Sequence, residues 1–86
     1  MTRDPVSGLL VALSPEGAGR LLLFAPDGAP AATIDPPPGY RLSHLVEAPD
    51  RLLVVGQGDA AVDGWHDWHF AIDAAKAALV RAGPAY

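Results

Sequence analysis

Glycine and proline interrupt this chain too often for any long helix to form. Nine glycines and nine prolines stand among its 86 residues, gathered in clusters between short apolar runs. A proline inside a helix removes a hydrogen bond and clashes with the preceding turn, and a glycine there costs about 1 kcal/mol relative to alanine. Clusters spaced about ten residues apart are typical of strands joined by tight turns. The pattern therefore excludes a helical bundle or a coiled coil.

The apolar runs between these clusters predict the strands. Tyr40–Glu47 alternates between two side-chain faces, as a strand does, and Arg51–Gly56 is apolar on both faces, which is typical of a strand covered from both sides. We expect an all-β fold, an antiparallel meander of about six or seven short strands, in one small β-rich domain that spans 1–86. The other expected strands are Gly8–Leu13, Arg20–Phe24, Ala31–Asp35 and Trp65–Ile72, with turns at 14–19, 25–28, 36–39 and 48–50, and a polar loop at 57–64.

The segment Asp73–Ala82 has two interpretations. Its alanines favour a helix over 73–82 that is capped by Asp73 and ended by Gly83-Pro84. The alternative is a hairpin in which Asp73–Ala77 forms the turn and Ala78–Ala82 the last strand. Tertiary pairing often overrides local propensity, so the sequence leaves both open.

Composition removes several classes of function. A net charge of −4 argues against a nucleic-acid partner, and no apolar run approaches the roughly 20 residues of a membrane span. Cysteine is absent, so no disulfide or thiolate metal site holds the fold together. Five arginines against one lysine indicate a GC-rich bacterial or phage genome. We interpret the apolar N-terminal run as a strand and not as a signal peptide, and a cytoplasmic location is favoured.

The segment 59–69 is the only chemically dense part of the chain. His66, His69, Asp63 and Asp67 are residue types that bind Zn²⁺. On a strand, however, His66 and His69 point to opposite faces, and Asp67 alone shares a face with His69. A small metal- or ligand-binding protein is therefore the alternative function, and we expect no cofactor.

The strand pattern resembles two consecutive blades of a β-propeller of the pyrroloquinoline-quinone-like or NHL-like type. Gly8–Leu13, Arg20–Phe24 and Ala31–Asp35 align with Arg51–Gly56, Trp68–Asp73 and Leu79–Ala82, and Pro26-Asp27-Gly28 matches the turn after the second strand. In the second copy Ala74-Ala75-Lys76 stands where the glycine of that turn is expected. The resemblance implies repeats at about 6–47 and 51–83, with Tyr40–Glu47 as the outer strand of the first.

Propellers close with about 4–8 blades, so two blades leave open edges that a partner must cover. We expect a non-enzymatic structural or protein-interaction module, because no nucleophile or phosphate-binding motif is present. Its partner is another protein or a further copy of the chain. Assembly would use strand edges at Leu9–Leu13 or Leu52–Val55 and an aromatic patch. The interaction residues that we predict are Trp65, Trp68, Tyr40, Leu53 and Val55.

Overall fold

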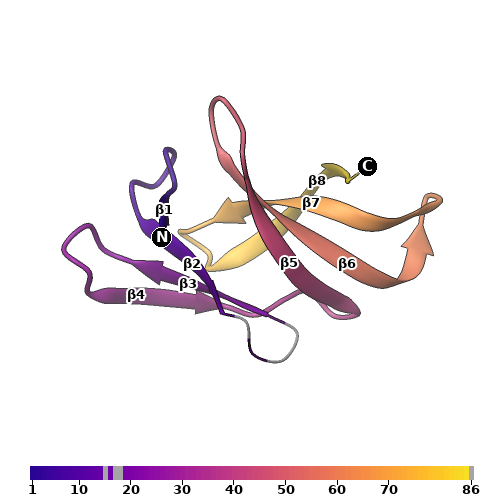
Figure 1. Ribbon diagram of the computed structural model, residues 1–86, viewed down its shortest axis with the longest axis horizontal. Coiled ribbons are helices and arrows are strands. Elements are labelled where there is room, and N and C mark those ends of the chain that lie inside the picture. Colours follow the sequence, from indigo (N-terminus) through magenta and orange to yellow (C-terminus); the bar gives the residue numbers. More distant parts are fainter. Residues whose placement is uncertain (15, 17–18, 86) are drawn as a thin grey trace.

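A computed structural model describes residues 1–14, 16 and 19–85. These residues form eight strands and no helix, arranged as two four-stranded antiparallel sheets (Figure 1). The all-β antiparallel fold predicted from the sequence is confirmed. The first sheet contains β1 (Thr2–Arg3), β2 (Leu10–Ser14), β3 (Arg20–Phe24) and β4 (Pro30–Ile34), and the second contains β5 (Tyr40–Glu47), β6 (Leu52–Val62), β7 (Trp65–Asp73) and β8 (Ala78–Pro84). Of the predicted turn at 14–19, Pro15, Gly17 and Ala18 lie outside the described residues, as does Tyr86.

The strands of each sheet follow one another in sequence order, as tight turns require. In the propeller alignment, β2, β3 and β4 correspond to β6, β7 and β8, and the structure gives each pair the same place in its sheet. Tyr40–Glu47 differs from the expectation, because it pairs with β6 and so begins the second sheet. The run Pro36-Pro37-Pro38 breaks the ladder after β4, since proline has no N–H to donate, and Gly39 turns the chain at a φ of 82°. The first place in the first sheet is taken by the short β1, which the sequence did not predict.

The segment 57–64, expected to be a loop, continues β6 as far as Val62. Asp63 and Gly64 then make a two-residue hairpin with φ values of 51° and 82°, and Val62 pairs with Trp65. Positive φ at both central positions is the signature of the type I′ turn that Asp-Gly favours. The loop prediction was wrong because small and polar residues can occupy an exposed strand, and because Asp63-Gly64 alone suffices to make the turn.

The C-terminal segment forms the hairpin and not the helix. The Asp73 carboxylate accepts a hydrogen bond from the Lys76 N–H at 3.1 Å, and the Ala77 N–H donates to the Ala74 carbonyl at 3.3 Å. Ala77 takes the left-handed conformation, with a φ of 50°, which is the conformation expected of the glycine that this turn lacks. The helical alternative at 73–82 is wrong because pairing of β8 with β7 outweighs alanine propensity.

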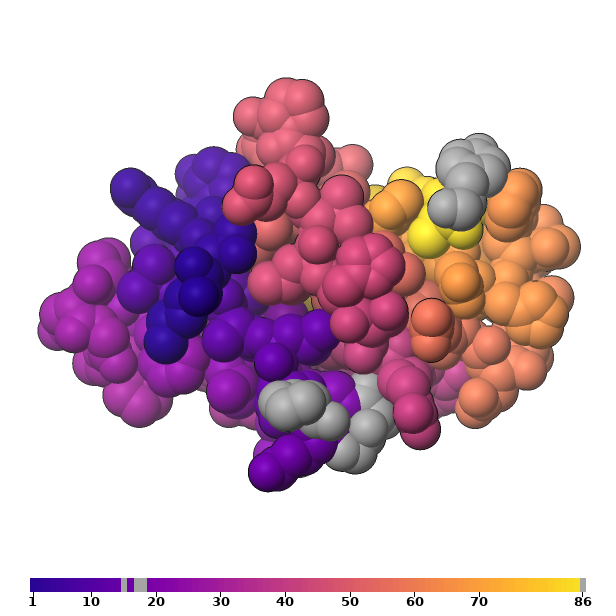
Figure 2. Space-filling view, in the orientation of Figure 1, coloured from indigo at the N-terminus to yellow at the C-terminus, as the bar shows by residue number. Residues whose placement is uncertain are grey.

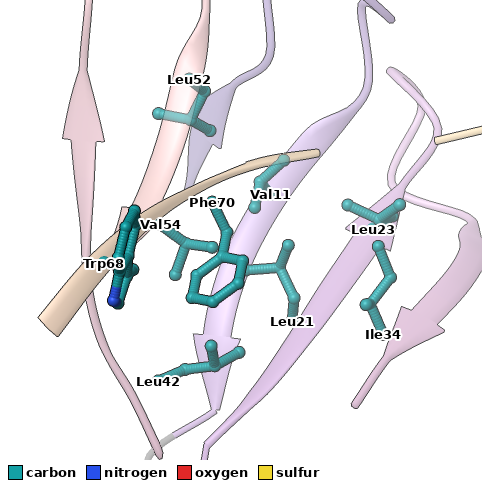
Figure 3. Close-up of a cluster of buried hydrophobic side chains, with 9 residues drawn as sticks. All are labelled: Val11, Leu21, Leu23, Ile34, Leu42, Leu52, Val54, Trp68 and Phe70. Carbon is teal, nitrogen blue, oxygen red and sulfur yellow. The ribbon is translucent and has the colours of Figure 1, made fainter. Parts of the chain in front are cut away.

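The two sheets share one hydrophobic core (Figure 3). Alternate residues of the longer strands face it, and Val11 and Leu21 from the first sheet and Val54 from the second are completely buried. Burial of each such side chain stabilises the fold by about 1.5–3 kcal/mol. The remaining members of the core are Leu23, Ile34, Leu42, Leu52, Trp68 and Phe70. One face of each sheet is thus committed to this core, and the other faces and the edges lie outside it.

Candidate functional site

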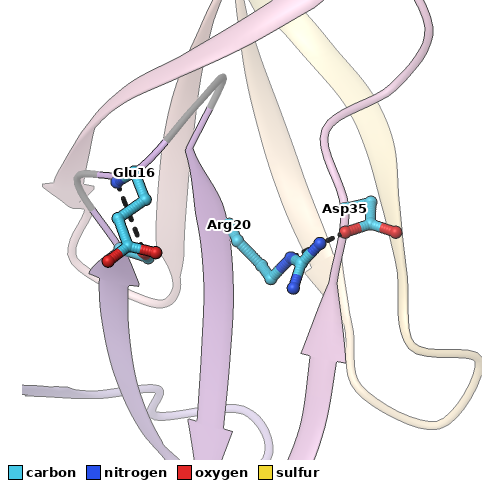
Figure 4. A network of polar contacts seen from close by, with 4 residues as sticks. Glu16, Arg20 and Asp35 are labelled. Atoms are coloured by element: carbon cyan, nitrogen blue, oxygen red, sulfur yellow. Dashed lines mark hydrogen bonds and ion pairs between the residues drawn. The ribbon is translucent and has the colours of Figure 1, made fainter.

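Each sheet ends in two edge strands, and the four edges are unequally protected. β1 is only two residues long. β4 begins with Pro30, and the exposed ion pair between Arg20 and Asp35, 2.9 Å apart, lies at its far end (Figure 4). Short strands, prolines and charges are the devices by which proteins prevent unwanted strand pairing. The edges of the first sheet therefore have such devices.

In the second sheet, β5 lies against the first sheet. A side chain at Gly19 would meet the Leu42 carbonyl oxygen at 2.9 Å, which shows how closely the chain before β3 approaches β5. In the space-filling view the segment of β5 lies beside the first sheet (Figure 2). β5 also carries Arg41 and Glu47. Part of this edge is therefore covered by the protein itself.

β8 is the open edge. It pairs with β7 on one side and with no strand of the described residues on the other. Alternate residues of such a strand direct their backbone N–H and C=O groups away from the sheet. Its central residues Val80, Arg81 and Ala82 are exposed, and the Val80 side chain is 53% exposed. Outward-directed backbone groups and an apolar side chain are therefore accessible together on this strand.

An apolar row crosses the second sheet and ends at this edge. The register places Val46 opposite Leu53, Leu53 opposite Ala71, and Ala71 opposite Val80. Directly paired residues of neighbouring strands project from the same face of a sheet. These four residues, which we call the apolar row, lie on the face away from the core, since none belongs to the shared cluster. Leu53, inside the row, is only 9% exposed, whereas Val80 at its end is not covered.

The one charged side chain of β8 is turned away from the open edge. The Arg81 guanidinium lies over the Trp68 ring, 4.7 Å from its centre, and 5.7 Å from the centre of the Tyr40 ring. It also donates a hydrogen bond of 2.7 Å to the Tyr40 hydroxyl. Cation–π stacking of this kind fixes the direction of an arginine even where it is exposed. Arg81 therefore lies across its own sheet and does not protect β8 as a free edge charge would.

Two glycines in β6 make room for this cluster. A side-chain carbon at Gly56 would lie 2.7 Å from the Phe70 ring and 3.3 Å from the Tyr40 ring, and one at Gly58 would lie 3.0 Å from Tyr40. Phe70 and Tyr40 meet edge to face with centres 5.2 Å apart, a favourable arrangement for two rings. Because Gly56 and Gly58 have no side chains, the Tyr40 ring can lie close to β6. The Tyr40 hydroxyl in turn accepts the hydrogen bond from Arg81.

A shallow groove of about 450 Å³ lies beside the start of β8. Its walls come from the end of β4, the three prolines 36–38 and the residues Ala77, Ala78 and Leu79. Both sheets thus contribute to it, but it contains only one ionisable side chain, Asp35, which is paired with Arg20. The groove therefore lies next to the start of the open edge.

The five predicted interaction residues differ in burial and lie in different parts of the structure. Trp65 is 39% exposed and remains on the surface. Trp68 is 8% exposed, belongs to the core and donates its indole N–H to the Trp65 carbonyl at 3.1 Å, while Tyr40 is half-buried and positions Arg81. Leu53 and Val55 are buried in β6. The contact surface expected from these five residues is therefore not a single patch.

One of the two predicted edge strands needs correction. Leu52–Val55 lies inside the second sheet, paired with both β5 and β7. β2 pairs with β3 along its whole length, but on its other side only Leu10 and Val11 pair with β1, so the predicted edge at Leu9–Leu13 is covered in part. Leu52–Val55 is therefore an interior segment, which agrees with its apolar side chains, because an interior strand can be covered on both faces and on both sides.

The residues of the metal-binding alternative are not brought together. Asp63 lies in the hairpin turn, and alternation along β7 places His66 on the face opposite to His69 and Asp67. The His66 ring is 3.4 Å from the Gly58 carbonyl oxygen, across the hairpin. Among the described residues no group of three or more His, Asp or Glu side chains is placed to hold a metal ion. The geometry thus gives this alternative no support.

Sequence reasoning missed Val80, Arg81 and Ala77. A signal for Ala77 was present, because the turn after the second strand of the blade pattern requires a left-handed residue. The sequence contains no comparable signal for Val80 or Arg81, because their roles depend on which strand lies at the edge of the sheet.

In the part of the chain that the structure describes, no helix is long and apolar enough to cross a membrane. No protein-family model matches this chain, and neither curated proteins nor solved structures include a significant match to it.

Proposed function

We propose that this protein is a non-enzymatic structural or protein-interaction module that assembles by strand addition at β8. The observation that carries the proposal is the open edge itself, a strand of seven residues whose apolar row ends in the exposed Val80. An extended partner that pairs with such an edge gains backbone hydrogen bonds, and its side chains supply specificity.

The other surfaces fit the same role. The groove beside Ala78 extends the edge toward the prolines 36–38 and would receive the end of an added strand. Trp65 is an exposed aromatic residue, of a type enriched in protein interfaces. A resemblance to two propeller blades leads to the same requirement, because two four-stranded sheets are too few to close a ring of about 4–8 blades. Assembly with other chains would satisfy it.

The test is the native mass together with the location of protected amides. Light scattering after size-exclusion chromatography, from about 5 to about 500 µM chain, should give masses that rise above the 8.9 kDa of one chain if the module assembles with itself. Hydrogen exchange measured at both ends of this range should show added protection in β8. A mass of 8.9 kDa throughout, with β8 amides that exchange equally at both concentrations, would contradict the proposal.

A further inference from the structure

We infer that the partner at β8 is a second copy of the same chain, paired antiparallel through β8 across a two-fold axis that passes beside Val80. This inference rests on the proposed function and names its partner. The two second sheets would join into one continuous sheet of eight strands, in which neither copy of β8 remains an edge.

The apolar row supplies the first reason. Within one chain, Leu53 is covered because Val46 and Ala71 flank it in the row. Val80 has Ala71 on one side only, and it is 53% exposed. A second Val80 on the open side would give it the second flanking neighbour that Leu53 already has, and the row would run unbroken through both copies.

The sequence of β8 supplies the second reason, because it is self-complementary in this register. Centring the pair on Val80 places Leu79 opposite Arg81 and Ala78 opposite Ala82, so no like charges face each other. Centring it on Arg81 would oppose two arginines and bring in Pro84, which has no N–H. Centring it on Leu79 would pair far less of the strand. Val80 is the centre that gives the longest ladder without a charge conflict.

The position of Arg81 supplies the third reason. A lysine or arginine that extends past an edge strand deters pairing with a second copy. Here the Arg81 guanidinium is held over Trp68 and bonded to the Tyr40 hydroxyl, on the core-facing side of the sheet. The apolar face of β8 and its backbone are therefore left accessible to a strand that approaches in the plane of the sheet.

Cysteine cross-linking tests the register directly, because the chain contains no cysteine of its own. In Val80→Cys the two thiols face each other across the axis, where Cα atoms of directly paired residues lie about 4.5–5.5 Å apart, within the range of a disulfide. In Ala78→Cys the two thiols are four residues apart along the ladder, about 13 Å, and do not reach each other. Mild oxidation should convert most of the first variant to a covalent dimer and leave the second monomeric. Equal cross-linking of the two variants, or none in either, would overturn the inference.

A charge at the axis tests the same contact without cross-linking. Val80→Lys places two ammonium groups side by side and should weaken dimerisation about tenfold or more by light scattering. Val6→Lys is the matched control, since Val6 is 72% exposed in the turn after β1, a strand of the other sheet, and it should leave the dimer unchanged. Circular dichroism verifies that both variants are folded. If the chain assembles and β8 gains protection from hydrogen exchange but Val80→Lys does not weaken assembly, the contact centred on Val80 is wrong and strand addition at β8 stands. If assembly leaves β8 unprotected, or if the unaltered chain is monomeric at all concentrations, both fail.

Discussion

Gly56→Ala is the substitution that most directly tests how the two aromatic rings lie on β6. An added side-chain carbon would meet the Phe70 ring at 2.7 Å, whereas ordinary van der Waals contact begins near 3.4 Å. Phe70 is 3% exposed within the shared core, so its ring has no free space into which to move. Overpacking of this kind costs about 1–3 kcal/mol.

Part of that cost is offset by the backbone. Alanine in a strand is favoured over glycine by about 0.5–1 kcal/mol, since glycine loses more conformational freedom on folding. We therefore expect a net loss of about 1–2 kcal/mol for Gly56→Ala, which lowers the melting temperature by roughly 5–15 °C in a domain of this size. Gly83→Ala is the matched control, because a side-chain carbon there meets nothing within 4 Å. It shares the backbone gain without the clash and should raise stability by a few tenths of a kcal/mol to about 1 kcal/mol.

Urea unfolding followed by circular dichroism measures both variants, and the difference between their free energies of unfolding gives the steric cost. The double substitution with Phe70→Leu refines the result, since a smaller side chain at Phe70 should remove part of the clash and produce a measurable coupling energy between the two sites. If Gly56→Ala is as stable as Gly83→Ala, the Phe70 ring does not lie over Gly56 and the described packing of β7 on β6 is wrong.

Ala77→Gly should stabilise the protein by about 0.5–1 kcal/mol, because Ala77 holds a left-handed φ of 50° that costs an L-residue energy and glycine almost none; a rise in melting temperature measures it, and an unchanged or lower value would contradict it. Gly28→Ala should act in the opposite direction in the corresponding turn of the first sheet, where φ is 93°, and unfolding in urea measures a loss of about 1 kcal/mol; no loss would be unexpected. Tyr40→Phe removes the hydroxyl that accepts the hydrogen bond from Arg81, and it should lower the free energy of unfolding by at most about 1 kcal/mol at this exposed site. The tryptophan fluorescence should also change, because Arg81 is then held less firmly over the Trp68 ring; a spectrum identical to that of the parent would contradict the assigned cluster. Asp35→Asn breaks an ion pair whose side chains are 59% and 74% exposed, and thermal unfolding should detect less than about 1 kcal/mol of change; a larger loss would show that the pair contributes more than its exposure allows.

Local chemistry alone determined much of the fold. The spacing of proline and glycine excluded long helices, and the runs at Arg20–Phe24 and Tyr40–Glu47 were predicted with the bounds that the structure has. Both results depend on neighbours in sequence, since a turn residue acts on the two or three residues around it and alternation is a property of a single strand. The Asp63-Gly64 turn belongs to the same class, because its dipeptide specifies a hairpin without help from the rest of the chain.

The tertiary structure alone decided the features that depend on contacts between residues far apart in sequence. Asp73–Ala82 has a composition that suits a helix, and it became a hairpin because β7 offered a strand to pair with. The apolar run Leu52–Val55 could not be recognised as an interior strand, nor Val80 as the end of an apolar row, until the order of strands in the sheet was fixed. Arg81 became a stacked residue only because Gly56 and Gly58, more than twenty residues earlier, leave space for the Tyr40 ring. Local propensity sets which conformations a segment can take at small cost, whereas pairing and burial, which join residues far apart in sequence, select among them and so place the open edge at β8.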